Sequence, residues 1–462
     1  MLVVRQGLVQ GLNIGGGILL ARLLSPAEFG VFGILSFLLG FLTAFGDFGL
    51  GAGLVQQPHL PTRSELRTVF TVQSLLLLAL AALVAIFAGP IAAFAHLPAH
   101  DAVVLRVIAL ALPFASAQAI PSVQLERSLS FGRLAVIEST QALAYNVTLI
   151  GLVWHGLGPL AVAFAILTRS MTGALVGTLV RRWPVGFALD RKRLPELMAF
   201  GIPFQGVMAV SMLKDSSTPV LVSTLFGAAA VGFVQWSQVV AAYPVFALMV
   251  FQRLYLPSFA RMQSHPEALG PFVERVLRLT NSVVAPLALL TLALIEPITR
   301  IVYGDKWLVA LPLFRLLWAA NLIVPTAQPL LSLISASGRS RLAFAFAVSW
   351  AVLTWGVGWL AMRWLGLIGF GWTNVVVQFT GFAVVSSAKR LTAFRALRAG
   401  VPPWACALPI AGLAWGWSHF HPLRSLPQLV AVLLAALAVY AVAFGPSLRR
   451  EVDSLRATEI PS

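Results

Sequence analysis

Long apolar runs follow one another along the whole chain. Runs such as 69–94 and 343–362 contain no charged residue, and the connections between runs are short. About 20 apolar residues are enough for a helix to cross a bilayer. Because the runs are continuous and do not alternate in short segments, they exclude a membrane β-barrel. The pattern predicts about fourteen spans, at 5–24, 30–55, 68–96, 104–122, 134–154, 159–180, 200–225, 229–256, 274–302, 308–336, 342–363, 367–388, 403–420 and 426–446.

The first two predicted spans meet at Ser25–Pro26. The stretch 21–32 reads ARLLSPAEFGVF, in which one apolar run ends near Arg22 and the next resumes at Gly30. Proline lacks an N–H and has a fixed φ, so it fits a turn or the first turn of a helix. We therefore expect a hairpin at the outer surface of the membrane here.

A weaker copy of this stretch recurs in the second half of the chain. Residues 18–33 align with residues 220–235, which places Gly30 on Gly232, and residues 121–135 align with 329–343. Matches in a common order predict two related six-helix halves in one orientation, with a transport pathway between them.

The expected domains follow from this repeat. They are an N-terminal six-helix bundle (1–182), a cytoplasmic linker (183–199), a C-terminal six-helix bundle (200–390), and two additional transmembrane helices with a cytoplasmic tail (391–462).

Composition supports the same class. The chain is 59% hydrophobic and 10% charged, with a mean hydropathy of +0.88, whereas soluble domains carry roughly 25% charged residues. Backbone groups in lipid must be satisfied within the segment, so we expect an all-α polytopic membrane protein. Cys406 is the single cysteine, which excludes an internal disulfide, and no Cys/His spacing resembles a metal site. No cofactor is expected.

The net charge of +16 would suggest a nucleic-acid partner in a soluble protein. In a membrane protein, basic residues instead set the orientation. Most of the 32 Lys and Arg fall on the side that holds both termini and the even-numbered connections, so this side is expected to be cytoplasmic. Because the first span begins near Met1, no cleavable signal peptide is expected. The opposite side carries Arg22, Arg106, Arg300, Lys306, Arg363 and Arg424.

Few ionisable residues lie within or near the spans. Such groups are costly at membrane depth and usually face a cavity or a partner. We interpret the basic ones as candidate ligands of an anionic substrate, and Asp47 and Asp215 as ion-coupling groups or charge partners. The basic candidates are Arg22, Arg106, Arg169, Lys214 and Arg315.

Most of these residues also have a structural interpretation, which the sequence leaves open. Arg22 ends the first span, from where its side chain could reach the interface. Lys214 and Asp215 are adjacent and could neutralise each other. Arg106 and Arg315 occupy repeat-related places near the outer ends, where they could form a basic gate or bond to a helix end.

Amide side chains extend the list of candidates. Within apolar spans they could bind polar groups of a substrate, or they could form hydrogen bonds between helices, worth about 1 kcal/mol each. Two of the pairs have the spacing that places both members on one helix face. The candidates are Gln10 with Asn13, Asn374 with Gln378, and Gln141 and Asn146.

Five segments carry a family resemblance. Those of the first half are ARLLSPAEFGVFGIL (21–35), FGDFGLGAGLVQQPHL (45–60) and LERSLSFGRLAVIE (125–138). Those of the second half are LMAFGIPFQGV (197–207) and EPITRIVYGDKWLVALPLFRLL (296–317). In these segments the chain resembles the Wzx-type polysaccharide flippases, of the multidrug/oligosaccharidyl-lipid/polysaccharide flippase superfamily, and the similarity runs over most of residues 21–389.

The resemblance implies two six-helix bundles in a V that open alternately to the two membrane faces and move undecaprenyl-pyrophosphate-linked sugars. A pyrophosphate favours arginine as its ligand, through planar charge-assisted hydrogen bonds. One departure concerns the seventh span. Relatives tend to have Arg and then Asp-Asn there, whereas this chain has Lys214-Asp215 with Thr218-Pro219. The acidic position of the family pattern is therefore only partly kept, as Asp215.

The sequence therefore predicts a flippase for a lipid-linked oligosaccharide in a bacterial inner membrane, serving O-antigen, capsule or exopolysaccharide export. Expected partners are the lipid-linked substrate, membrane lipids, a polysaccharide polymerase and a chain-length regulator, and no nucleic acid. A multidrug or organic-cation exporter is the first alternative, although its cavity should be rich in carboxylates. A membrane glycan polymerase is the second, although the outer connections, such as 155–158, are too short for a catalytic domain.

Overall fold

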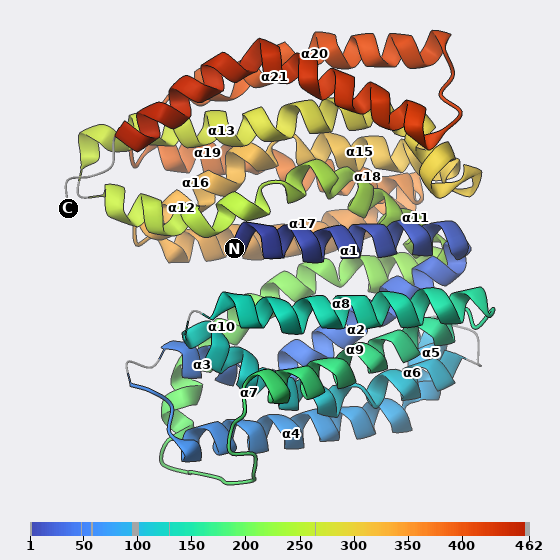
Figure 1. Cartoon of the computed structure of the whole chain (residues 1–462), viewed down its shortest axis with the longest axis vertical. Coiled ribbons are helices and arrows are strands. Elements are labelled where there is room, and N and C mark those ends of the chain that lie inside the picture. The colour runs from blue at the N-terminus through green and yellow to red at the C-terminus, as the bar shows by residue number, and fades with distance from the viewer. Residues whose placement is uncertain are drawn as a thin grey trace. The chain divides into compact units, whose positions relative to one another are not determined.

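The computed structural model describes residues 2–47, 49–56, 59–94, 101–128, 130–263 and 265–457. Within these ranges the chain forms helices and no strand (Figure 1). Ten helices are long and apolar enough to cross a membrane, or eleven if one bent pair counts as a span. The predicted all-α polytopic class is confirmed.

The count of fourteen spans stays a prediction. It differs from the ten membrane-length helices at places that can be identified. Helices α1 (Leu2–Leu23) and α20 (Ala396–Phe420) have 22 and 25 residues, yet they are not among the ten. The stretch Met208–Phe246 counts once. Gly227, at φ 78° and ψ −179°, interrupts it between the predicted seventh and eighth spans.

The chain divides into two compact units, Met1–Phe233 and Val234–Ser462. The first unit contains α1, α2 (Pro26–Asp47), α3 (Leu50–Gln56), α4 (Arg63–Ile86), α5 (Ala88–Phe94), α6 (Asp101–Ala109), α7 (Leu112–Arg127), α8 (Phe131–Trp154), α9 (Pro159–Val180), α10 (Leu194–Asp215), the π-helical turn η1 (Thr218–Val222) and the first part of α11 (Ser223–Phe246).

The second unit holds the rest of α11 and the elements that follow. They are α12 (Met249–Met262), α13 (Pro266–Ala293), α14 (Ile295–Ile298), η2 (Thr299–Tyr303), η3 (Asp305–Ala310), α15 (Leu311–Asn321), α16 (Val324–Ala336), α17 (Ser340–Leu365), α18 (Ile368–Phe379), α19 (Gly381–Lys389), α20 and α21 (Leu426–Ala457).

The predicted turn between the first two spans at Ser25–Pro26 is confirmed, and its place at the outer surface stays a prediction. Helix α1 ends at Leu23 and α2 begins at Pro26. The Ser25 N–H donates to Glu28 Oε2 at 2.8 Å, and the Glu28 N–H donates to Ser25 Oγ at 3.3 Å. This reciprocal capping box satisfies backbone donors that the start of a helix leaves unpaired.

Some predicted spans are pairs of helices that meet at a proline. The predicted span 104–122 comprises α6 and α7, and Pro113 lies in the first turn of α7. The predicted span 308–336 comprises two helical segments bent by 41°, and Pro325 lies in the first turn of α16. Proline cannot donate the hydrogen bond that would continue the preceding helix, so the helix breaks inside an unbroken apolar run.

A close helix crossing joins α2 to the start of α11 within the first unit. A Cβ atom added at Gly30 would lie 1.8 Å from the Ala228 carbonyl oxygen, and one added at Gly232 would lie 1.9 Å from the Pro26 carbonyl oxygen. In the predicted repeat alignment Gly30 corresponds to Gly232 and Pro26 to Ala228. The contact is therefore reciprocal, as expected of two segments related by an approximate two-fold axis.

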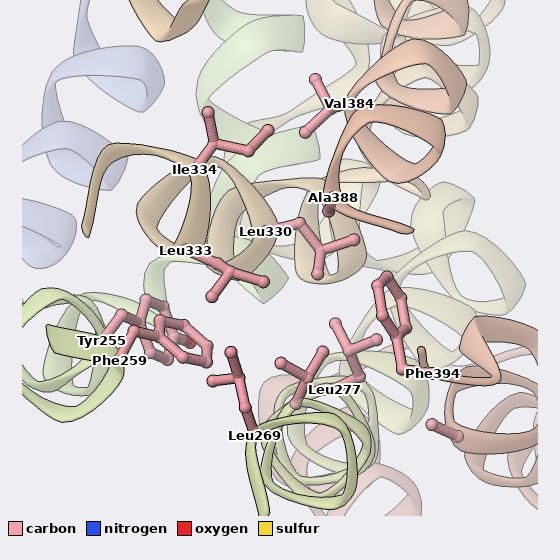
Figure 2. Close-up of a cluster of buried hydrophobic side chains, with 12 residues drawn as sticks. Tyr255, Phe259, Leu269, Leu277, Leu330, Leu333, Ile334, Val384, Ala388 and Phe394 are labelled. Carbon is pink, nitrogen blue, oxygen red and sulfur yellow. The ribbon is translucent and has the colours of Figure 1, made fainter. Parts of the chain in front are cut away.

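The second unit has its own buried core. Figure 2 shows side chains from α12, α13, α16 and α19 converging in one cluster. Its fully buried members include Phe259, Leu277, Leu330 and Val384. Burying large apolar side chains contributes about 1.5–3 kcal/mol each, so this cluster holds the helices of the unit together.

Candidate functional site

A cavity of about 730 Å³ lies within the first unit, among α1, α2, α7, α8 and α9. We call it the N-unit cavity. Its volume falls in the range of ligand pockets, roughly 300–1,000 Å³. Apolar side chains share its wall with polar ones, which are Asn13, Ser36, Thr43, Asp47, Gln118, Gln141, Tyr145, Asn146, Arg169 and Ser170.

Arg169 is the one basic residue in the described wall of this cavity. It comes from the middle of α9, and its guanidinium carbon lies 5.9 Å from the centroid of the Tyr145 ring on α8. Within the described residues, no carboxylate lies at ion-pair distance from Arg169. An aromatic face attracts a cation without neutralising it. The positive charge is therefore held in place and available to an anionic ligand.

Asp47 is placed by a break in the second span. It is the last residue of α2, and Gly49 follows at φ 71° before α3 begins at Leu50. Asp47 Oδ1 accepts hydrogen bonds from Gln73 Nε2 at 2.6 Å and from the Gly51 N–H at 3.3 Å. A cavity carboxylate is thus fixed by a neighbouring helix and by the helix that follows it.

Glycine is required at the break by backbone conformation and by packing. L-residues with a side chain rarely adopt the positive φ of Gly49. A Cβ atom there would also lie 2.3 Å from the carbonyl oxygen of Gly201 on α10. The break that positions Asp47 is therefore packed directly against the seventh predicted span.

Two glutamines form a pair in another part of the wall. Gln141 Nε2 on α8 donates to Gln118 Oε1 on α7 at 2.7 Å. Both amides lie against Gly173 of α9, where a Cβ atom would approach them to 1.8 and 2.5 Å. The pair leaves polar groups directed at the cavity, and such groups suit the hydroxyls of a sugar.

We expect Gly173→Ala to displace this glutamine pair and to lower the transport that the sequence predicts by about five- to tenfold, the equivalent of one hydrogen bond. The added methyl group meets only the ends of flexible side chains, so the protein should fold normally. The measurement is the export rate at matched protein level. Gly177→Ala is the control, because its Cβ atom would make ordinary contacts of 3.6 Å with Pro121. Equal rates in both variants would contradict the role of the pair.

Of the residues singled out in the sequence, the structure brings Asn13, Asp47, Arg169, Gln141 and Asn146 together around the N-unit cavity. The others lie elsewhere. Gln10 lies on α1 outside the cavity wall, Arg22 is exposed at the end of α1, and Arg106 is exposed on α6.

Lys214 and Asp215 pair with each other, since Lys214 Nζ lies 2.6 Å from Asp215 Oδ1 at the end of α10. Two candidates lie in the second unit. Arg315 is exposed on α15, and Asn374 Nδ2 donates to the Phe370 carbonyl oxygen within α18. For these residues a substrate role stays a prediction.

Sequence reasoning missed three residues of the site. Gln118 and Gln73 are amides within apolar runs, and the criterion that selected Gln141 would have selected them as well. Tyr145 follows Gln141 by four residues, which places both on one helix face. Its position over Arg169 has no sequence signal, because the packing of α8 on α9 creates it.

Membrane-length helices around a polar cavity with one basic residue in its described wall define the class: this is a multi-pass membrane protein with a cavity of ligand size. Residues 19–312 match the model of a family described as polysaccharide biosynthesis protein. The chain belongs to this family of polysaccharide biosynthesis proteins.

Named relatives and solved structures agree with this class. The chain is 25% identical to the succinoglycan biosynthesis transport protein ExoT of Rhizobium meliloti, over 95% of this chain and 91% of that protein. It is 21% identical to the lipopolysaccharide biosynthesis protein WzxC of Escherichia coli, over 74% of this chain and 70% of that protein. Its fold is similar to that of the lipid II flippase MurJ in an inward closed conformation, with a TM-score of 0.73 and 15% identity. The match covers 98% of this chain and 99% of that structure.

Proposed function

We propose that this protein carries a polyprenyl-pyrophosphate-linked oligosaccharide across the bacterial inner membrane by alternating access, for export of O-antigen, capsule or exopolysaccharide. The observation that carries the proposal is the N-unit cavity, with the Arg169 charge and several amides in one wall. Membership of a polysaccharide biosynthesis family supports it. The protein acts as a transporter and not as an enzyme.

The chemistry of the cavity suits the two polar parts of such a substrate. A guanidinium forms paired charge-assisted hydrogen bonds with phosphate oxygens. The amides of Asn13, Gln118 and Gln141 have donors and acceptors for sugar hydroxyls. The polar head group would thus cross the membrane without contacting hydrocarbon, while the lipid tail stays in the bilayer.

The direct test is genetic and chemical. Deletion of the gene should remove the surface polysaccharide and make the lipid-linked precursor accumulate on the cytoplasmic side, and the intact gene should reverse both changes. A deletion strain with normal polysaccharide and no accumulated precursor would contradict the proposal.

Asp47 is the carboxylate that we propose couples transport to an ion gradient. Asp47→Asn keeps an oxygen for the Gln73 and Gly51 hydrogen bonds and removes the negative charge. In liposomes loaded with lipid-linked substrate, an imposed pH gradient should accelerate transport by the unchanged protein and have no effect on this variant. Equal acceleration of both would exclude Asp47. Loss of the response in Asp215→Asn instead would assign coupling to α10.

The same carboxylate is the observation that favours the alternative, an organic-cation exporter. The fold is also similar to that of an inward-facing multidrug resistance MATE family transporter, with a TM-score of 0.65 and 15% identity. The match covers 84% of this chain and 95% of that structure. An exporter of this kind should protect cells from cationic drugs. Unchanged drug sensitivity in the deletion strain, together with lost polysaccharide, would decide for the flippase.

We further infer that both termini lie in the cytoplasm and that the protein works beside a polysaccharide polymerase and a chain-length regulator. The distribution of Lys and Arg supports this orientation. The two partners follow from the chemistry of the pathway, because a flipped oligosaccharide must next be polymerised and its length controlled.

A further inference from the structure

The connection between α9 and α10 is docked along the start of α4. Residues 182–190 form neither helix nor strand and lie beside the first turns of that helix (Figure 1). Arg67 Nε donates to the Pro184 carbonyl oxygen at 3.0 Å, and the Ala188 N–H donates to Thr71 Oγ1 at 3.0 Å. We call residues 182–192 the docked linker.

Two further contacts fix the register of the docked linker. The Asp190 N–H donates to Thr68 Oγ1 at 2.9 Å, and Trp183 packs edge-on against Phe70 with ring centroids 5.0 Å apart. Side chains of α4 therefore bind both ends of the linker. The linker is therefore held on α4 and leaves some of its side chains exposed.

The exposed face of the linker is apolar, and one of its side chains also contacts α4: the Phe187 ring centroid lies 5.6 Å from that of Phe70. Val185, Phe187 and Leu189 are 59%, 73% and 49% exposed, while the intervening residues 186 and 188 are partly buried. This alternation is the period of an extended chain. Three large apolar side chains in a row on one exposed face are unusual for a segment in water.

The linker continues the membrane-facing side of α4. Thr68 and Thr71, which the linker covers, lie on the same helix face as Leu75 and Leu78, at spacings of three and four residues. Leu75 and Leu78 are exposed on a helix that is long and apolar enough to span the membrane. At the start of α4, the linker covers the helix, and the apolar side chains exposed there belong to the linker.

Basic side chains lie at both ends of the apolar face. Arg182 precedes it, and Arg191 and Lys192 follow it; all three are exposed. The acidic residues nearby have partners of other kinds: Asp190 Oδ1 accepts the Lys192 N–H at 3.1 Å, and Glu196 pairs with Arg193 at 2.9 Å. The attraction between one basic residue and an anionic membrane surface contributes about 1 kcal/mol.

We propose that the docked linker is a lipid-binding surface that inserts into the leaflet on the side of the termini. Val185, Phe187 and Leu189 enter the boundary between head groups and acyl chains, and Arg182, Arg191 and Lys192 bind anionic phospholipid head groups. Irregular backbone cannot enter the hydrocarbon core, because its polar groups would lose their partners. The linker therefore lies at the interface, where amphipathic segments bind.

Spin labels test the insertion. In a Cys406→Ser background, which removes the single cysteine, labels are attached at Val185→Cys, Phe187→Cys, Leu189→Cys and, as controls, Ala188→Cys and Lys192→Cys. Labels at the three apolar positions should be more accessible to oxygen than to a water-soluble nickel complex. The label at position 188 should be shielded from both, and that at 192 should favour nickel. Greater nickel access at the three apolar positions, or shielding there from both reagents, would overturn the proposal.

Brominated lipids test the head-group preference. A fluorophore at position 187 should be quenched more by brominated phosphatidylglycerol than by brominated phosphatidylcholine. Each of Arg182→Gln, Arg191→Gln and Lys192→Gln should lower this preference by about fivefold. The matched control is Arg133→Gln, which removes an exposed charge at the start of α8 and should leave the preference unchanged. Equal quenching by the two lipids before any substitution would overturn this part.

Neither assay contains a transported substrate. The outcome is therefore independent of the proposed flippase activity, and a failure of one proposal is distinguishable from a failure of the other.

Discussion

Arg169→Ala should stop the export of surface polysaccharide while the amount of protein in the membrane stays unchanged. Arg169 holds the one positive charge in the described cavity wall, and hydrogen bonds to charged groups contribute about 1.5–3 kcal/mol. Loss of such a contact corresponds to a decrease in rate of about 10- to 100-fold. The measurement is surface polysaccharide by gel or immunoblot, together with the level of tagged protein. Arg169→Lys keeps the charge without the planar fork and should restore part of the rate.

Two other arginines sharpen this test. Arg133→Ala removes an exposed charge that lies on α8 about two turns before Gln141 and is not part of the cavity wall, so export should stay normal. The sequence interpretation expects Arg22→Ala to stop export as well, although Arg22 is not part of the cavity wall. If Arg22→Ala abolishes export and Arg169→Ala does not, the N-unit cavity is not the binding site. Normal export in both variants would remove both residues from the site.

Gly30→Ala and Gly232→Ala should each destabilise the protein by about 1–3 kcal/mol, the usual cost of an overpacked contact. The new methyl groups would lie 1.8 and 1.9 Å from backbone carbonyl oxygens, which do not rotate away as a side chain does. The measurement is the thermal unfolding midpoint in detergent, and the recorded signal is the loss of monodisperse protein.

Gly151→Ala is the matched control for this crossing. It adds the same methyl group in the interior of α8, where nothing lies within 4 Å, and alanine favours a helix over glycine. Its midpoint should equal or exceed that of the unchanged protein. The double variant Gly30→Ala/Gly232→Ala should be less destabilised than the sum of the single variants, because both disturb one contact. Midpoints equal to the control would mean that the two backbones are not in contact.

Run length and turn chemistry predicted much of the fold. Apolar runs of membrane length marked most helices, and Pro26 marked a turn or helix start that the structure confirms as the start of α2. The helix breaks were less accessible. Pro113 and Asp47 both lie at breaks within apolar runs, and hydropathy averages across such positions.

The site was only partly predictable. Asp47 and Arg169 stood out because charge is rare at membrane depth. The hydrogen bond from Gln73 to Asp47, the ring of Tyr145 beside Arg169 and the Gln118–Gln141 pair each join residues on different helices. Such contacts depend on the rotation and depth of one helix against another. Periodicity within one helix carries no information about either quantity.

The break after Asp47 has a thermodynamic consequence for the proposed coupling. Gln205 Nε2 of α10 donates to the Ala44 carbonyl oxygen at 2.8 Å, and a Cβ atom at Gly53 would lie 2.9 Å from the Leu197 carbonyl oxygen. The end of α2, Gly53 of α3 and the neighbouring part of α10 are thus joined by direct contacts, and we expect them to move as one block. Linkage is reciprocal: if ion uptake at Asp47 repositions that block, then whatever repositions α10 alters the ion affinity of Asp47 by an equal free energy.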